Sequence, residues 1–138
     1  MPEIALRLAA AETVARDLGR LAMSYFNDIS RLSISMKGAQ DWLTAADGAV
    51  EAAFRARMAS LFPDDAVIGE EMGGVSADRL WIIDPIDGTA NFAHGDRTWC
   101  VSIGYLERGR PVAGIVYAPA LDEMFVARTG GGATLNGA

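Results

Sequence analysis

The chain has 138 residues, of which 51% are hydrophobic and 22% are charged, and its formal net charge is −6. This composition excludes a disordered chain, and the length fits a single domain over residues 1–138. The excess of 18 Asp and Glu over 12 Lys and Arg argues against a nucleic-acid partner. Because Cys100 is the only cysteine, we expect a cytoplasmic protein, and we expect neither a signal sequence nor a membrane anchor.

The first half of the chain alternates between helical and extended patterns. Apolar residues recur at spacings of three and four over residues 1–29, which predicts a helix. Apolar and polar residues alternate over 32–37, which predicts a strand that Gly38 ends. The segment "DWLT" at 41–44 is interpreted as a short returning strand. Helical spacing then resumes and predicts a second helix over about 46–61.

The second half is richer in strand patterns. "AVIG" at 66–69 and "LWII" at 80–83 predict two strands, and each runs directly into acidic residues. Alternation from residue 99 onwards, with a turn at 107–111, predicts an antiparallel meander. The glycine-rich segment 129–138 offers only one small apolar pair.

The segment "DPIDGT" at 84–89 combines two carboxylates with turn residues. Pro85 favours extended geometry at Asp84, Gly88 permits a left-handed turn, and Thr89 can cap a short helix over 89–94. Amides at a helix start attract phosphate, whereas carboxylates attract cations. The segment therefore offers both halves of a metal–phosphate site.

Acidic residues at two strand ends raise an electrostatic problem. If Glu70 and Glu71 converge with Asp84 and Asp87, two charges ~4 Å apart repel by about 4 kcal/mol at an effective dielectric near 20, so a cation is needed among them. An all-oxygen donor set without a histidine or thiolate cluster favours Mg²⁺, before Mn²⁺ or Ca²⁺, over zinc.

Each piece taken alone has a plainer explanation. Asp-Pro-x-Asp-Gly is common turn chemistry, Glu70-Glu71 is often a solvated pair, and Thr44-x-x-Asp47 fits a capping box ahead of an apolar helix. His94 fits a surface or packing position. Three further residues are expected in packed positions: Cys100, Trp81 and Trp99.

Taken in order and spacing, three segments resemble the inositol monophosphatase family: "DWLTAAD" at 41–47, "GEE" at 69–71 and "WIIDPIDGTANFAH" at 81–94. Residues 101–127 and 130–137 continue the likeness. The resemblance implies an α+β layered, αβαβα-type phosphatase fold, here as two helices packed on a mostly antiparallel sheet. It further implies a lithium-sensitive, Mg²⁺-dependent enzyme that hydrolyses a small phosphate monoester, often as a homodimer.

The resemblance also assigns roles to individual residues. It implies that Glu70, Asp84 and the carbonyl of Ile86 bind a first metal ion, and that Asp84 bridges to a second ion at Asp87. Two or three Mg²⁺ ions are implied, with Mn²⁺ as a substitute. Thr89, assisted by Asp47, is implied to activate a water molecule, and Glu70 is implied to be catalytic as well as a metal ligand. The Gly88 and Thr89 amides are implied to bind phosphate. The residues implied to support the site are Glu71, Asp41 and Lys37. The resemblance further implies in-line attack by water, for which no covalent phosphoenzyme is required.

Two departures from the family pattern bear on function. Residues 96–99 are more polar than usual, and family members continue beyond the "NG" turn with a further aspartate ligand for the second metal. We therefore expect the fold to be incomplete at its C-terminus and the chain alone to be weakly active or inactive.

Several functions remain open at this point. The substrate is inositol monophosphate or a related sugar phosphate, or alternatively histidinol phosphate, fructose bisphosphate or phosphoadenosine phosphate. The rival from another class is a non-catalytic remnant that binds metal or phosphate or serves as a subunit interface, and metal binding without turnover would identify it.

Overall fold

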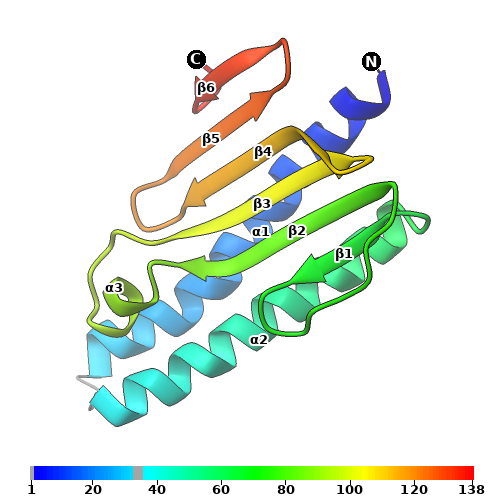
Figure 1. Cartoon of the computed structure of the whole chain (residues 1–138). Coiled ribbons are helices and arrows are strands. Elements are labelled where there is room, and N and C mark those ends of the chain that lie inside the picture. The colour runs from blue at the N-terminus through cyan, green and yellow to red at the C-terminus, as the bar shows by residue number, and fades with distance from the viewer. Residues whose placement is uncertain (1, 33–35) are drawn as a thin grey trace.

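The computed structural model describes the backbone of residues 2–32 and 36–138 and the side chains of residues 3–29 and 38–138. Two long helices, α1 (Pro2–Leu32) and α2 (Met36–Leu61), lie side by side on one face of a six-stranded sheet (Figure 1). A short helix, α3 (Thr89–Ala93), stands at one end of the sheet. The strands are β1 (Ala66–Gly69), β2 (Arg79–Asp87), β3 (Cys100–Glu107), β4 (Arg110–Ala118), β5 (Glu123–Arg128) and β6 (Gly132–Leu135).

The sheet is mixed and follows chain order from β1 to β6. β1 runs parallel to β2, and every other neighbouring pair is antiparallel. The β3–β4 hairpin turns at Arg108 and Gly109, whose φ angles of 52° and 79° are those of the two-residue turn that matches strand twist. The prediction of two helices on a mostly antiparallel sheet is confirmed.

The hydrophobic core fills the space between the helices and the sheet. Trp81 and Trp99 are buried as predicted, with 1% and 3% of their surface exposed. Gly19 allows α1 to approach β4 closely, because a Cβ at this position would come within 2.4 Å of the Tyr117 ring. The buried apolar residues of α1 recur at helical spacing: Ala11, Val14, Ala15, Leu18, Ala22, Phe26 and Ile29.

Two predicted strands are wrong. Leu32 ends α1 and Met36 begins α2, while residues 33–35 lie outside the described part of the chain. Residues 41–44 also belong to α2, which therefore begins well before the predicted residue 46. The buried stripe of α2 starts with Ala39, Leu43 and Ala46, and small alanines make its helical period hard to see.

One smaller expectation fails, and one strand was not predicted. Thr44 does not cap a helix, because it lies inside α2 and its hydroxyl donates to the Gln40 carbonyl at 3.0 Å. The glycine-rich segment contains β6, which pairs with β5 from Gly132 to Leu135.

None of the helices within the described residues combines the length and apolarity needed to cross a membrane.

Candidate functional site

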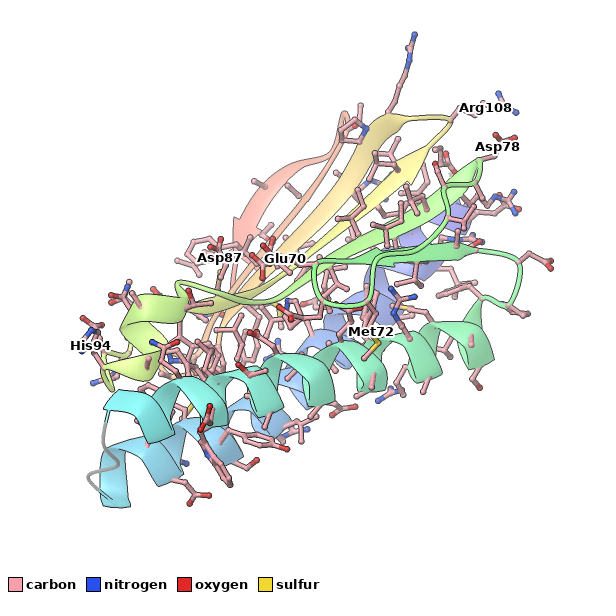
Figure 2. The ribbon with its side chains drawn as sticks, turned by 60° about the horizontal axis from the view of Figure 1, so that its bottom comes forward. Glu70, Met72, Asp78, Asp87, His94 and Arg108 are labelled. Atoms are coloured by element: carbon pink, nitrogen blue, oxygen red, sulfur yellow. The ribbon has the colours of Figure 1, made fainter. Side chains whose placement is uncertain are left out.

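The parallel pairing of β1 and β2 brings two acidic residues together. Gly69 lies opposite Ile83, so the residues that follow, Glu70 and Asp84, are neighbours at the same sheet end. The Glu70 amide donates to the Ile83 carbonyl at 3.3 Å, which continues the pairing beyond β1. Glu70 and Asp87 lie at this end, where β2 approaches α3 (Figure 2).

Asp84 is half-buried and electrostatically strained. Burial, followed by contact with the Glu70 side chain and the charge of Asp87, raises the pKa of Asp84 to about 7, although the Ile86 amide opposes this. Its Oδ1 atom is buried without a hydrogen-bond partner. Such an atom leaves an acceptor available for a cation or a proton.

β2 does not end before Asp84, as the sequence suggested, but continues to Asp87. Asp84 pairs with Ser102 and Asp87 with Cys100, so β2 accommodates one extra residue between them. This is a bulge, a feature that redirects side chains at strand ends. Pro85 is tolerated within it because a bulged residue need not donate to the ladder.

Gly88 turns the chain from β2 into α3. Its φ of 95° and ψ of 44° are left-handed, and a Cβ there would meet the Thr98 carbonyl oxygen at 3.1 Å and the Trp99 Cα at 3.2 Å. Thr89 is the first residue of α3, its side chain is exposed, and no side-chain hydrogen bond caps the helix. The expectation that Thr89 caps α3 is therefore wrong.

Asp47 reaches the site from α2 and is 7% exposed. Burial raises its pKa to about 7, and the charges of Glu71, Asp84, Glu70 and Glu51 add to this in that order. The structure thus gathers carboxylates from α2, the end of β1 and β2. We call Asp47, Glu70, Glu71, Asp84 and Asp87 the acidic group.

Other predicted site residues lie further out. Within the described side chains, Thr89 and Asp47 share no direct hydrogen bond. Asp41 is exposed and precedes Asp47 by roughly 9 Å along α2 and about 240° around its axis, so the two residues occupy different sides of the helix. Lys37 lies in the first turn of α2, and its side chain is outside the described residues. His94 is exposed beyond α3 (Figure 2).

Two residues near the site were missed from the sequence. Glu51 is fully buried in α2 and accepts hydrogen bonds from the Glu71 and Met72 amides, both at 2.9 Å. Arg55 donates to Glu51 at 3.1 Å. A signal existed, since Glu51 stands one turn after Asp47 on the apolar face of α2 and has an arginine at the i+4 position.

The acidic group stands at one end of an apolar groove of about 810 Å³ on the sheet face opposite the two helices. Glu70 and Asp84 line this end, and Phe125 of β5 and Thr134 of β6 line the other. A polar ligand at the acidic group would therefore have an apolar wall beside it.

The donor chemistry of the acidic group fits a hard divalent cation. The donors are carboxylate oxygens, and Asp84 has an unpaired buried oxygen. Burial, with the neighbouring negative charges, raises the pKa values of Asp47 and Asp84 to about 7. Within the described residues, no three Asp, Glu, His or Cys side chains are yet arranged to hold an ion on their own. The side chains of Glu70 and Asp87 are exposed at this end of the sheet.

Known proteins are similar to this chain in both sequence and fold. The inositol-1-monophosphatase of Mesorhizobium japonicum is 37% identical over 125 residues, which cover 88% of this chain and 47% of that protein. A Thermotoga maritima protein named fructose-1,6-bisphosphatase/inositol-1-monophosphatase is 37% identical, with coverage of 95% and 51%. The solved inositol monophosphatase from Anabaena (Nostoc) has a TM-score of 0.82 at 34% identity, with coverage of 97% and 48%.

This chain spans about half the length of these curated relatives. The sequence model of the inositol monophosphatase family matches residues 5–138. Since this match includes almost every residue of the chain, and the sheet and helices superpose on a solved member, the chain belongs to the inositol monophosphatase family.

Proposed function

We propose that the acidic group binds Mg²⁺ and forms part of an active site that hydrolyses a small phosphate monoester, inositol monophosphate or a related sugar phosphate. One observation carries this proposal: the β1–β2 register sets Glu70 beside Asp84, whose Oδ1 lacks a partner. Family membership supports the choice of reaction.

Four residues would hold the cations: the side chains of Glu70, Asp84 and Asp87 and the carbonyl of Ile86. Two or three Mg²⁺ ions are proposed, and Mn²⁺ should substitute because it accepts the same oxygen donors. When bound, Mg²⁺ supplies a water of lowered pKa and neutralises charge on the phosphate.

The chain's own groups complete the chemistry. Asp47 is buried beside the other carboxylates, and a bound cation would keep it charged, so it would act with Thr89 in accepting the proton from the attacking water. The Thr89 hydroxyl would orient this water, which would itself link the two side chains. The Gly88 and Thr89 amides would donate to phosphate oxygens, and the left-handed Gly88 supports this placement.

A second substrate class is favoured by one relative. The Thermotoga maritima protein is named for fructose-1,6-bisphosphatase as well as inositol-1-monophosphatase activity, at 37% identity. Fructose 1,6-bisphosphate therefore belongs beside inositol monophosphate in any substrate test.

The proposal is tested by measuring inorganic phosphate released from both substrates across a Mg²⁺ titration. We expect weak Mg²⁺-dependent release, because the second metal lacks a ligand in this chain. That release should be lost in Asp87→Asn, inhibited by Li⁺ and retained in Asp64→Asn, which changes an exposed aspartate ahead of β1. Cation binding without release would support a metal-binding remnant instead. Absence of both binding and release would overturn the proposal.

A further inference from the structure

Glu51 makes unusual contacts for a helix residue. Its carboxylate is fully buried, and each oxygen receives a backbone amide from outside α2: Oε1 from Glu71 and Oε2 from Met72, both at 2.9 Å. The Arg55 Nε donates to Oε2 at 3.1 Å. Three donors thus satisfy a charge that would be costly to bury alone.

Arg55 contacts the chain on both sides of Glu70. Its Nη2 donates to the Gly73 carbonyl, and its Nη1 lies 3.4 Å from the Val67 carbonyl of β1. Gly69 and Gly73 close the loop by exchanging two amide–carbonyl hydrogen bonds of 2.9 and 2.8 Å. We call residues 69–73 the acidic loop. Met72 lies over α2, in agreement with these contacts (Figure 2).

These contacts bracket Glu70 on both sides. On one side, the Glu51 carboxylate lies so close to Gly69 that a Cβ there would be 2.1 Å from its carboxyl carbon. On the other side, the next amide, that of Glu71, is bound by Glu51. The Glu70 amide itself is bound to Ile83. The backbone that carries the Glu70 side chain is therefore fixed by α2 and β2.

We propose that Glu51 and Arg55 are positioning residues that hold the acidic loop so that Glu70 meets Asp84 at the cation site. This inference rests on the proposed function, because it takes Glu70 and Asp84 as cation ligands. Groups that fix metal ligands typically change metal affinity by about 10- to 100-fold when they are removed.

Glu51→Gln tests the carboxylate with little change in volume. Glutamine has one acceptor oxygen and would turn an NH₂ group towards a backbone amide, so one of the two loop contacts is lost. The matched control is Glu12→Gln in α1, which breaks an exposed pair with Arg16 at the same i,i+4 spacing. The two variants differ in contact with the acidic loop.

Gly69→Ala tests the same contact without removing a charge. Its Cβ would displace the Glu51 carboxylate from the loop amides. The control is Gly114→Ala in β4, another strand glycine, where a Cβ would meet only the Ile103 carbonyl oxygen at 3.7 Å.

Mn²⁺ affinity, measured from the electron paramagnetic resonance signal of free Mn²⁺, is the main readout. We expect Glu51→Gln and Gly69→Ala to weaken Mn²⁺ binding by about 10-fold or more, and the two controls to bind as the wild type does. Hydrogen exchange at the Glu71 and Met72 amides should accelerate in Glu51→Gln without metal. In turnover, the Mg²⁺ concentration for half-maximal rate should rise, while the rate at saturating Mg²⁺ is kept.

The outcomes separate the two proposals. If the wild type binds Mn²⁺ and Glu51→Gln binds it equally well, the positioning role is overturned and the proposed function stands, even if the variant unfolds at a lower temperature. If Arg55→Lys, which keeps the charge, retains more affinity than Arg55→Ala, the positioning role gains support. A wild type that binds no Mn²⁺ overturns the proposed function and the positioning role with it.

Discussion

Asp47 and Asp84 make the stability of the metal-free protein depend on pH near neutrality. Each has a pKa raised from 3.8 to about 7, so between these values the folded state holds more protons than the unfolded state. Stability from these groups is complete below pH ~4 and is lost as pH rises through about 7. We expect metal-free protein to have a lower free energy of unfolding at pH 8 than at pH 6, and Asp47→Asn to show a smaller decrease.

Urea unfolding in EDTA at a series of pH values measures this difference. Added Mg²⁺ should remove the decrease, because a cation favours the charged carboxylates. Identical pH slopes in the wild type and Asp47→Asn would show that Asp47 is not protonated near neutral pH in the folded protein.

Gly88 combines a left-handed backbone with close neighbours. Gly88→Ala should lower the free energy of unfolding by about 2 kcal/mol or more, because an L-residue is strained at positive φ by ~1–2 kcal/mol and the Cβ also crowds Thr98 and Trp99. Gly109→Ala is the control, since its φ of 79° carries the same strain but nothing lies within 4 Å of an added Cβ. Chemical denaturation should show a larger loss of the free energy of unfolding in Gly88→Ala than in Gly109→Ala, and Mg²⁺-dependent phosphate release should also differ between the two variants. Equal losses would show that crowding of Thr98 and Trp99 by the added Cβ contributes nothing.

The sequence identified most of the acidic group because short local motifs place these residues directly after apolar strand patterns. Glu51 was missed although helical spacing places it on the apolar face of α2, and its role could not be predicted because its amide partners lie 20 and 21 residues further along the chain. The sequence also misplaced the end of β2, since Pro85 usually stops a strand and only the pairing with β3 reveals the bulge.

A buried ion pair joins α1 to the sheet. Arg7 binds Asp65 through two hydrogen bonds of 2.7 and 2.9 Å, and the Trp81 indole donates to the same carboxylate at 3.0 Å. The Arg7 guanidinium also lies over the Phe62 ring, 4.6 Å from its centroid. Asp65 has no exposed side-chain surface, so removing Arg7 would leave a buried, uncompensated charge.

Arg7→Met is therefore expected to lower the free energy of unfolding by about 3–5 kcal/mol. Arg79→Met, which breaks an exposed pair with Glu3, should cost about 1 kcal/mol or less. Urea denaturation at one pH compares them. Similar losses in both variants would mean that the Arg7 pair behaves as a solvated surface pair.

Periodicity predicted most elements, and its failures have a common cause. Residues 32–37 alternate over too short a window to establish a strand. The buried stripe of α2 begins with an alanine, Ala39, so local pattern favoured a strand at 41–44, where the chain is helical. β6 was missed because its glycines carry no strand signal, and pairing with β5 alone defines it.

The sheet face opposite the helices exposes large apolar side chains. Val116 and Phe125 pair across β4 and β5 and remain 38% and 42% exposed. This 138-residue chain should bind a hydrophobic dye such as ANS, and Val116→Lys with Phe125→Lys should reduce dye fluorescence without lowering the unfolding midpoint. Leu6→Lys, at a 64% exposed site on α1, is the control.

The molar mass of the same samples, measured by light scattering, would test the expected homodimer. Dye binding that is unchanged in the double variant would show that the dye binds elsewhere.

The position of α1 beneath β4 also bears on how the chain folds during synthesis. α1 and α2 leave the ribosome before the sheet and can pair as a helical hairpin. Arg7 can contact Asp65 only after 58 more residues are made, and Gly19 can contact Tyr117 only after a still longer segment. Contacts between such distant residues slow folding, because a long segment must be ordered before any of them forms. The newly made helices would therefore hold an uncovered apolar face until the β3–β4 hairpin closes over it, and this interval is when the nascent chain would depend most on chaperones.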